Sequence, residues 1–161
     1  EPYRRQRQMC IRDSYYTLVR GRVTQKLDST CYLQKDNAKN IVRISDYPWK
    51  QGKSEEIHSI FYPVKKNDDY TLVKVELITG KSHQIRAQLK HLGYPVVGDT
   101  KYGIPVVNRY FADAYHVKHQ LLHCGNIIFK ETDGPLSYLG GKEYSAFLPE
   151  PFRTIEKDLF G

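Results

Sequence analysis

The stretch that most constrains how this chain can fold runs from residue 70 to residue 93. Its first part alternates between apolar and polar side chains and places Val73, Val75 and Leu77 on one face, as a half-buried strand requires. Its second part has the apolar spacing of a helix, and a Gly-Lys-Ser turn joins the two parts. The sequence therefore predicts a strand that passes through a turn at Gly80 directly into a helix.

The predicted helix has a start signal and a stop signal. Ser82 is a good N-cap residue, and Gly93 is a good residue to end a helix. Three apolar residues recur between them at core-facing spacing: Ile85, Leu89 and Leu92. This stretch is therefore expected to be a helix with one buried face.

A cationic stripe lies beside the apolar face of this helix. His83, Arg86 and Lys90 follow one another at intervals of three and four residues, which places them on one side. A cationic stripe at the start of a helix can meet an anion, although a solvated helix face is the commoner reason for such spacing.

Composition favours a soluble domain with an acidic partner. The 161 residues are 40% hydrophobic and 27% charged, which suits one globular domain or part of one. The net charge of +7 and the pI of about 9.2 favour a polyanion such as RNA. No apolar run approaches the ~20 residues of a membrane span, so no membrane association and a cytoplasmic location are expected. Three cysteines without paired spacing are expected to be reduced thiols.

The remaining elements are shorter, and they indicate an α+β fold. Strands followed singly by helices, without regular alternation, are typical of a mixed, largely antiparallel sheet with few helices. Strands are predicted at 15–23, 41–44, 57–64, 121–129 and 142–147, and helices within 104–118 and 149–160.

Several motifs of the chain resemble one enzyme family. The run Thr-Gly-Lys-Ser-His-Gln-Ile-Arg at 79–86, with Leu-Gly-Tyr-Pro-Val-Val-Gly-Asp at 92–99 and Lys-Tyr-Gly at 101–103, resembles the signature of the RluA/RluD-type pseudouridine synthases. The likeness continues in register through 15–21, 121–123 and 146–149. It implies the C-terminal part of a catalytic domain that isomerises uridine to pseudouridine in structured RNA, as a monomer without cofactor or metal. The expected RNA is that of the large ribosomal subunit, with transfer RNA as the other possible partner.

The resemblance assigns two catalytic residues. Arg86 matches the arginine that holds the catalytic carboxylate, for which a guanidinium fork is suited. Tyr15 matches the tyrosine whose ring stacks on the flipped uracil and whose hydroxyl is a candidate for proton transfer at C5.

Further positions are expected to contact the base or the RNA backbone. His83 and Gln84 resemble positions that support the pocket, although a helix-start residue bonded to its neighbours would explain His83 equally well. An apolar residue beside the tyrosine is matched by Leu121 or Leu122, and Leu122 is the one that we predict. Lys81 and Lys90 are candidates for phosphate contacts, with solvated surface as the alternative.

The catalytic aspartate of the family has no match here. It belongs to a His-Arg-Leu-Asp segment, and these 161 residues contain none. Asp28 follows the tyrosine-bearing strand, where the family has a loop, and is not expected to replace it. The chain alone is therefore expected to be inactive, and a non-catalytic RNA-binding module is the alternative.

The first 14 residues do not share the resemblance. They carry four arginines without strand or helix periodicity, and the likeness stops between Ser14 and Tyr15. The chain is thus divided into an artefactual or disordered segment, 1–14, and a partial catalytic domain, 15–161. A basic RNA-binding arm is the other interpretation of 1–14.

One different chemistry has a sequence signal. Short spacings separate His116, His119, His123 and Cys124, and such a cluster could bind zinc. It ranks below the family interpretation, because His123 belongs to a matching motif. Glycine-rich nucleotide-binding loops are absent from the sequence, so no nucleotide cofactor is expected.

Overall fold

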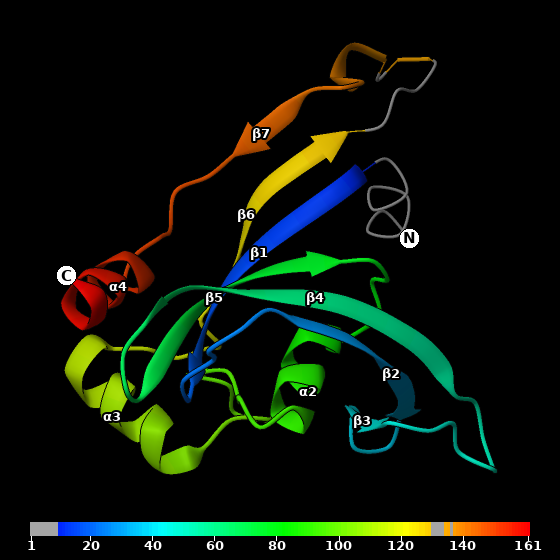
Figure 1. Cartoon of the computed structure of the whole chain (residues 1–161), viewed down its shortest axis with the longest axis horizontal. Helices are drawn as coiled ribbons and strands as arrows, with labels where there is room; N and C mark the ends of the chain where they lie inside the picture. The colour runs from blue at the N-terminus through cyan, green and yellow to red at the C-terminus, as the bar shows by residue number, and fades with distance from the viewer. Residues whose placement is uncertain (1–9, 130–133, 136) are drawn as a thin grey trace.

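The computed structural model describes residues 10–129, 134–135 and 137–161, and seven strands of this part form one sheet (Figure 1). The strand order is β3-β2-β4-β5-β1-β6-β7, and every neighbouring pair is antiparallel. The strands are β1 (Cys10–Arg20), β2 (Leu27–Asp36), β3 (Ile41–Ser45), β4 (Glu55–Lys66), β5 (Tyr70–Leu77), β6 (Leu122–Phe129) and β7 (Glu143–Ser145). The α+β class and the largely antiparallel sheet are confirmed.

Strand β1 lies between β5 and β6 and starts earlier than predicted. Tyr15 pairs with Val75 on one side and with Cys124 on the other. The strand includes residues 10–14, where Ser14 is buried and pairs with Glu76 of β5. Residues 10–14 pair with β6, and β5 joins only at Ser14, so the pairing with β6 extends the strand where the sequence pattern is irregular. Residues 1–9 lie outside the described part, and the domain boundary after residue 14 stays a prediction.

Strand β2 is an element that the sequence analysis did not predict. Buried and exposed positions alternate along it, and Cys31 and Leu33 are its buried residues. They pack with Ile57 of β4 and Ala87 of the helix described next. Only these two of its ten residues are buried, so its apolar signal is weak.

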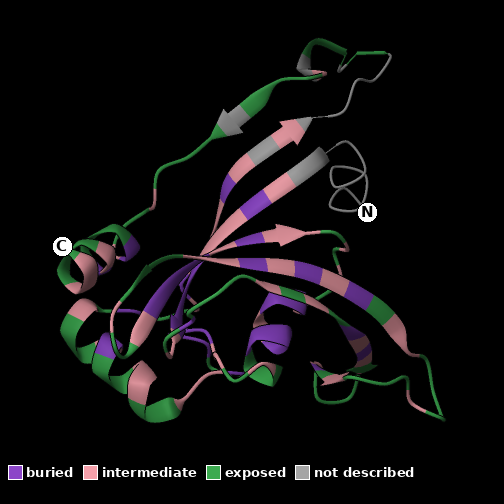
Figure 2. Cartoon of the chain, in the orientation of Figure 1, coloured by how far each residue is buried: buried purple, intermediate pink, exposed green. Residues whose placement is uncertain are grey.

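Helix α2 (Gln84–His91) is the predicted helix after β5. Ile85 and Leu89 are buried and pack against Val73 and Val75 of β5, and Figure 2 shows α2 mostly buried beneath the sheet. Fully burying a side chain such as Leu89 contributes about 1.5–3 kcal/mol relative to exposing it. The predicted apolar stripe therefore holds α2 on the sheet.

The two ends of α2 differ in how well the sequence indicated them. Gly93 follows the helix with φ 93°, as the stop signal predicted. The N-cap, however, is His83 and not Ser82. His83 has φ 55° and ψ 18°, a left-handed conformation that is uncommon for a residue with a side chain. The turn therefore continues one residue beyond the predicted start.

Two further helices lie on the face of the sheet opposite α2. They are α3 (Pro105–Tyr115) and α4 (Phe152–Phe160), and a short 3-10 turn, η1 (Ser137–Leu139), precedes β7. Both helices pack with Leu72 of β5, whereas Val73, the next residue of the strand, packs with α2. Phe111 of α3 packs in one cluster with Phe152 and Ile155 of α4, which confirms both predicted helices. Within the described residues, no helix has the length and apolar character needed to cross a membrane.

Candidate active site

One pocket brings together most of the residues that the sequence singled out. It has a volume of about 220 Å³ and opens between the start of α2 and strands β5, β1 and β6. Its lining consists of Tyr15, Leu77, His83, Gln84, Ile85, Arg86, Gln120 and Leu122. Five of the seven predicted site residues lie there, although they come from three separate parts of the chain.

Three neighbouring strands form the apolar wall of this pocket. Leu77 ends β5, Tyr15 lies on β1 and Leu122 begins β6. All three are partly buried and pack against the cluster that contains Ile85 and Leu89. Leu121, the alternative to Leu122, is buried in a different cluster with Leu18 and Phe111. The aromatic ring of Tyr15, flanked by two leucines, suits stacking against a base.

Arg86 forms a two-point ion pair within the chain. Its Nε donates to Asp99 Oδ2 at 2.6 Å, and its Nη2 donates to Asp99 Oδ1 at 2.9 Å. The Asp99 side chain is 0% exposed and the Arg86 side chain is 12% exposed. The cationic stripe predicted on α2 is thus interrupted, because the charge of Arg86 is neutralised from a turn thirteen residues further on.

The surroundings of Asp99 keep its carboxylate ionised. Burial acts to raise the pKa of Asp99, but hydrogen bonds from Arg86 and from the backbone N–H groups of Tyr102 and Lys101 outweigh it and lower the pKa. In return, the hydrogen bond to Asp99 raises the pKa of Arg86. Both groups are therefore charged at neutral pH.

Arg86 keeps donors for a second anion. A guanidinium has five N–H donors arranged on two edges, and Asp99 uses the edge of Nε and Nη2. The other edge, with Nη1, makes no hydrogen bond to the residues that the structure describes, and Arg86 lines the pocket. Asp99 thus orients Arg86 while the remaining edge stays available.

Gln84 braces the turn before α2. Its side-chain oxygen accepts hydrogen bonds from the Thr79 hydroxyl and the Lys81 backbone N–H, both at 3.0 Å. Its amide nitrogen donates to Ser59 Oγ at 2.8 Å and to the His58 carbonyl at 3.3 Å. Gln84 lines the pocket, yet these bonds use both ends of its amide, so it supports the wall of the pocket from inside the protein.

The two predicted phosphate-binding lysines lie outside this pocket. Lys81 Nζ is 3.5 Å from Glu55 Oε1, and Lys53 pairs with the same carboxylate. Lys90 is exposed and lines a second pocket of about 300 Å³. Their role as phosphate contacts stays a prediction.

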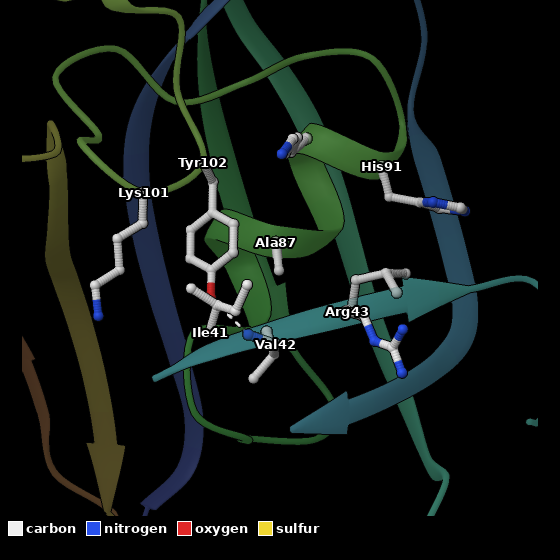
Figure 3. A pocket seen from close by; sticks show the side chains of 9 residues that line it. Ile41, Val42, Arg43, Ala87, His91, Lys101 and Tyr102 are labelled. Atoms are coloured by element: carbon white, nitrogen blue, oxygen red, sulfur yellow. Dashed lines mark hydrogen bonds between the residues drawn. The ribbon is translucent and has the colours of Figure 1, made fainter. Parts of the chain in front are cut away.

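The second pocket lies between β3 and α2 (Figure 3). Its floor includes Ile41, Val42 and Ala87, while the side chains of Arg43 and His91 point away from one another in Figure 3. Arg43 and His91 also have partners of their own, because Arg43 donates to Gln34 Oε1 and His91 Nε2 lies 2.8 Å from Asp46 Oδ1.

Asp28 and the zinc cluster were the two alternatives to the family interpretation, and neither forms a site at the first pocket. Asp28, with a 55% exposed side chain, pairs with His58 Nε2 at 2.5 Å and does not line the pocket. Among the described residues, no group of three or more His, Cys, Asp or Glu side chains could hold a metal ion. The zinc cluster considered from His116, His119, His123 and Cys124 is therefore not formed.

Three residues that belong to the site were not predicted from the sequence. Asp99 and Tyr102 lie in motifs that matched the family, but the sequence assigned no role to either. Gln120 lines the pocket one residue before the matching Leu-Leu-His motif. The motifs could thus be recognised in the sequence, but the sequence did not show which of their side chains come into contact in the folded chain.

Comparison with known proteins places the chain in a family. The family model described as RNA pseudouridylate synthase matches residues 4–91. A ribosomal large subunit pseudouridine synthase C from Buchnera aphidicola is 34% identical over 95% of this chain and 47% of its own length. An uncharacterized RNA pseudouridine synthase from Chloroflexus aurantiacus is 63% identical over 56% of this chain and 26% of its own length. The chain thus spans about half or less of the length of these relatives.

A solved structure supports the same assignment at the level of the fold. The human RNA pseudouridylate synthase domain containing 1 superposes with a TM-score of 0.62 at 19% identity, covering 98% of this chain and 69% of that one. The motifs at 79–86 and 92–103, the antiparallel sheet and the family match all agree. The chain belongs to the RNA pseudouridylate synthase family and is of the RluA/RluD type.

Proposed function

We propose that this chain supplies one wall of the uridine pocket in an RNA pseudouridine synthase that acts on structured RNA of the large ribosomal subunit. The observation that carries the proposal is the convergence of Tyr15, His83, Arg86 and Leu122 on one pocket. Relatives from Buchnera aphidicola and Vibrio cholerae are named ribosomal large subunit pseudouridine synthase C, which supports the choice of RNA.

The lining suits the steps of the reaction. Pseudouridine formation breaks the bond between C1′ and N1 of uridine and joins C1′ to C5, so the base must leave the stack and turn within a pocket. The Tyr15 ring and Leu122 offer flat apolar surface on which a uracil can stack and rotate. The tyrosine hydroxyl is the candidate group for proton transfer at C5.

Arg86 is proposed to hold the catalytic carboxylate with its second edge. Asp99 already binds the first edge, so Arg86 would lie between two carboxylates. The added guanidinium contact would keep the catalytic carboxylate ionised in a poorly hydrated pocket. This carboxylate comes from a His-Arg-Leu-Asp segment, which these 161 residues do not contain.

The chain alone is therefore proposed to bind RNA weakly and to isomerise none of it. The test uses RNA that carries tritium at uridine C5, because isomerisation releases the label to water. The purified 161-residue chain should retard the RNA at low salt and release no tritium. Enzyme-dependent release that Asp28→Ala abolishes would show that the catalytic carboxylate is Asp28.

A non-catalytic RNA-binding module is the second candidate, because the net charge of +7 suits RNA binding with or without catalysis. The coding sequence upstream of Tyr15 separates the two. A His-Arg-Leu-Asp segment there, together with tritium release by the longer protein, supports the enzyme. RNA binding by the longer protein without release supports the module.

A further inference from the structure

Tyr102 lies between the two pockets and contacts residues of each. It is 4% exposed, and it follows Asp99 in the turn after α2. Its ring meets the His83 ring edge-on, with 5.6 Å between the ring centres and 74° between the planes. The Arg86 guanidinium lies 5.2 Å from the centre of the same ring. Tyr102 is thus packed against two residues of the candidate active site without lining that pocket.

The Tyr102 hydroxyl makes two hydrogen bonds. The Val42 backbone N–H on the edge strand β3 donates to it at 2.8 Å, and Figure 3 shows the hydroxyl pointing at that strand. The second bond joins the hydroxyl to His83 Nδ1 at 2.9 Å. Because a backbone N–H can only donate, the hydroxyl oxygen is the acceptor in the first bond.

The hydrogen-bond inventory fixes the direction of the second bond. A tyrosine hydroxyl has one proton, and a buried O–H without an acceptor is unfavourable. If His83 Nδ1 carried a proton, the hydroxyl would accept twice, and its own proton would have no acceptor among the described residues. The Tyr102 O–H must therefore donate to an unprotonated Nδ1.

An unprotonated Nδ1 in a neutral imidazole means that Nε2 carries the proton. The surroundings favour this neutral form. Burial lowers the pKa of His83, the charges of Arg86, Lys101 and Lys35 lower it further, and Asp99 acts in the opposite direction.

The backbone of His83 sets the direction in which its side chain leaves the chain. His83 has the left-handed conformation φ 55° at the start of α2, which is uncommon for a residue with a side chain. His83 lines the same pocket as Tyr15 and Arg86. Its Nε2 has no hydrogen bond to the residues that the structure describes, so its proton is available to a ligand.

We propose that Tyr102 is a positioning residue that fixes His83 as the neutral Nε2–H tautomer, so that His83 donates a hydrogen bond to an oxygen of the nucleotide in the Tyr15 pocket. The tautomer follows from the protein alone. Only the identity of the acceptor, a uracil carbonyl or a phosphodiester oxygen, rests on the proposed function.

The tautomer can be measured directly in the 161-residue chain. Long-range ¹H–¹⁵N NMR of protein labelled in histidine distinguishes a protonated Nε2 from a protonated Nδ1, and His83→Gln assigns the signal. We expect a protonated Nε2 and an unprotonated Nδ1. A protonated Nδ1 in the wild-type chain would overturn the proposal without any variant being needed.

The variant Tyr102→Phe tests which group donates. The hydroxyl bond stabilises neutral His83, so its removal should raise the pKa of His83 by about 0.5–1 unit. If Nδ1–H were the donor, the pKa would fall instead. Tyr115→Phe is the matched control, because it removes one tyrosine hydrogen bond, to Asp158, away from His83. An unchanged or lowered pKa of His83 in Tyr102→Phe contradicts the proposal.

The acceptor is tested with two probes, uridine 5′-monophosphate and inorganic phosphate. A downfield shift of the His83 Nε2–H proton with the nucleotide alone identifies a uracil oxygen, and a shift with both probes identifies a phosphate oxygen. If neither probe moves the signal while the tautomer is as expected, the donor role toward a nucleotide fails and the positioning role of Tyr102 stands.

Discussion

Arg86 and Asp99 bind each other through two parallel hydrogen bonds, and the Asp99 carboxylate is wholly enclosed. Four N–H groups converge on this carboxylate, two from Arg86 and one each from the backbones of Lys101 and Tyr102. The pair therefore ties helix α2 to the turn that carries Tyr102.

Asp99→Asn should lower the free energy of unfolding by about 3–5 kcal/mol, because it leaves a largely buried guanidinium without its anion. Urea unfolding followed by circular dichroism measures this. Asp68→Asn is the control, since Asp68 pairs with Arg22 while their side chains are 92% and 52% exposed. The control should change stability by less than about 1 kcal/mol. A similar loss of unfolding free energy in both variants would contradict the prediction that the enclosed Arg86–Asp99 pair stabilises the fold more than an exposed pair does.

Stability should also fall with acid in a way that depends on Asp99. The pKa of Asp99 is lower in the folded chain than its ordinary value of about 3.9. The contribution of Asp99 to the free energy of unfolding is therefore fully present above that value and is lost as the pH falls toward the pKa of Asp99 in the folded chain. The difference in unfolding free energy between wild type and Asp99→Asn should narrow below about pH 4. A constant difference from pH 7 to pH 3 would exclude this titration.

Arg86→Lys should lose nearly all pseudouridine formation in a longer protein that also carries a His-Arg-Leu-Asp segment. A lysine ammonium has a point charge and cannot bind two carboxylates through two planar edges. Arg86→Ala should be inactive as well, and it should also unfold more easily because Asp99 loses its partner. Tritium release measures activity. Turnover by folded Arg86→Lys at the wild-type rate would remove Arg86 from the site.

Tyr15→Phe separates stacking from proton transfer. The variant keeps the ring and should bind RNA as the wild type does, while single-turnover product formation slows if the hydroxyl takes part. Tyr15→Ala should weaken binding of an unstacked uridine by about 1–3 kcal/mol. Equal single-turnover rates for Tyr15→Phe and wild type would limit Tyr15 to stacking.

Lys90→Gln and Lys81→Gln should differ in their effect on RNA binding. Lys90 is exposed and has no ion pair among the described residues, whereas Lys81 lies within 3.5 Å of Glu55. If Lys90 binds a phosphate, its replacement by glutamine should reduce the slope of log K against log salt by about 0.7 for single-stranded RNA. Lys81→Gln should change the slope less. Fluorescence anisotropy at several salt concentrations decides, and equal slopes in wild type and Lys90→Gln would exclude phosphate binding by Lys90.

Features with a strong local period were predictable from the sequence. Val73 and Val75 alternate in β5, and Ile85 and Leu89 recur in α2, so the pattern of burial follows the pattern of residues. The same holds for Phe152 and Ile155 of α4. The family was predictable because its motifs are contiguous in the sequence.

Features that depend on distant partners were not predictable. Strand β2 has only Cys31 and Leu33 buried, and it is defined by pairing with β3 and β4. The Arg86–Asp99 pair joins two motifs that a turn brings together. Likewise, the N-cap at His83 depends on a left-handed backbone that nothing in the local sequence requires.

Because Asp99 fixes the orientation of Arg86, the side-chain entropy of Arg86 is lost when the chain folds and not when a ligand binds. A free arginine side chain carries about 2 kcal/mol of rotamer entropy, which it gives up on binding an anion. Asp99 has already immobilised Arg86 in the folded chain. A second carboxylate arriving at the unused edge therefore meets a rigid partner, and that part of the ordering cost belongs to folding rather than to the assembly of the catalytic centre.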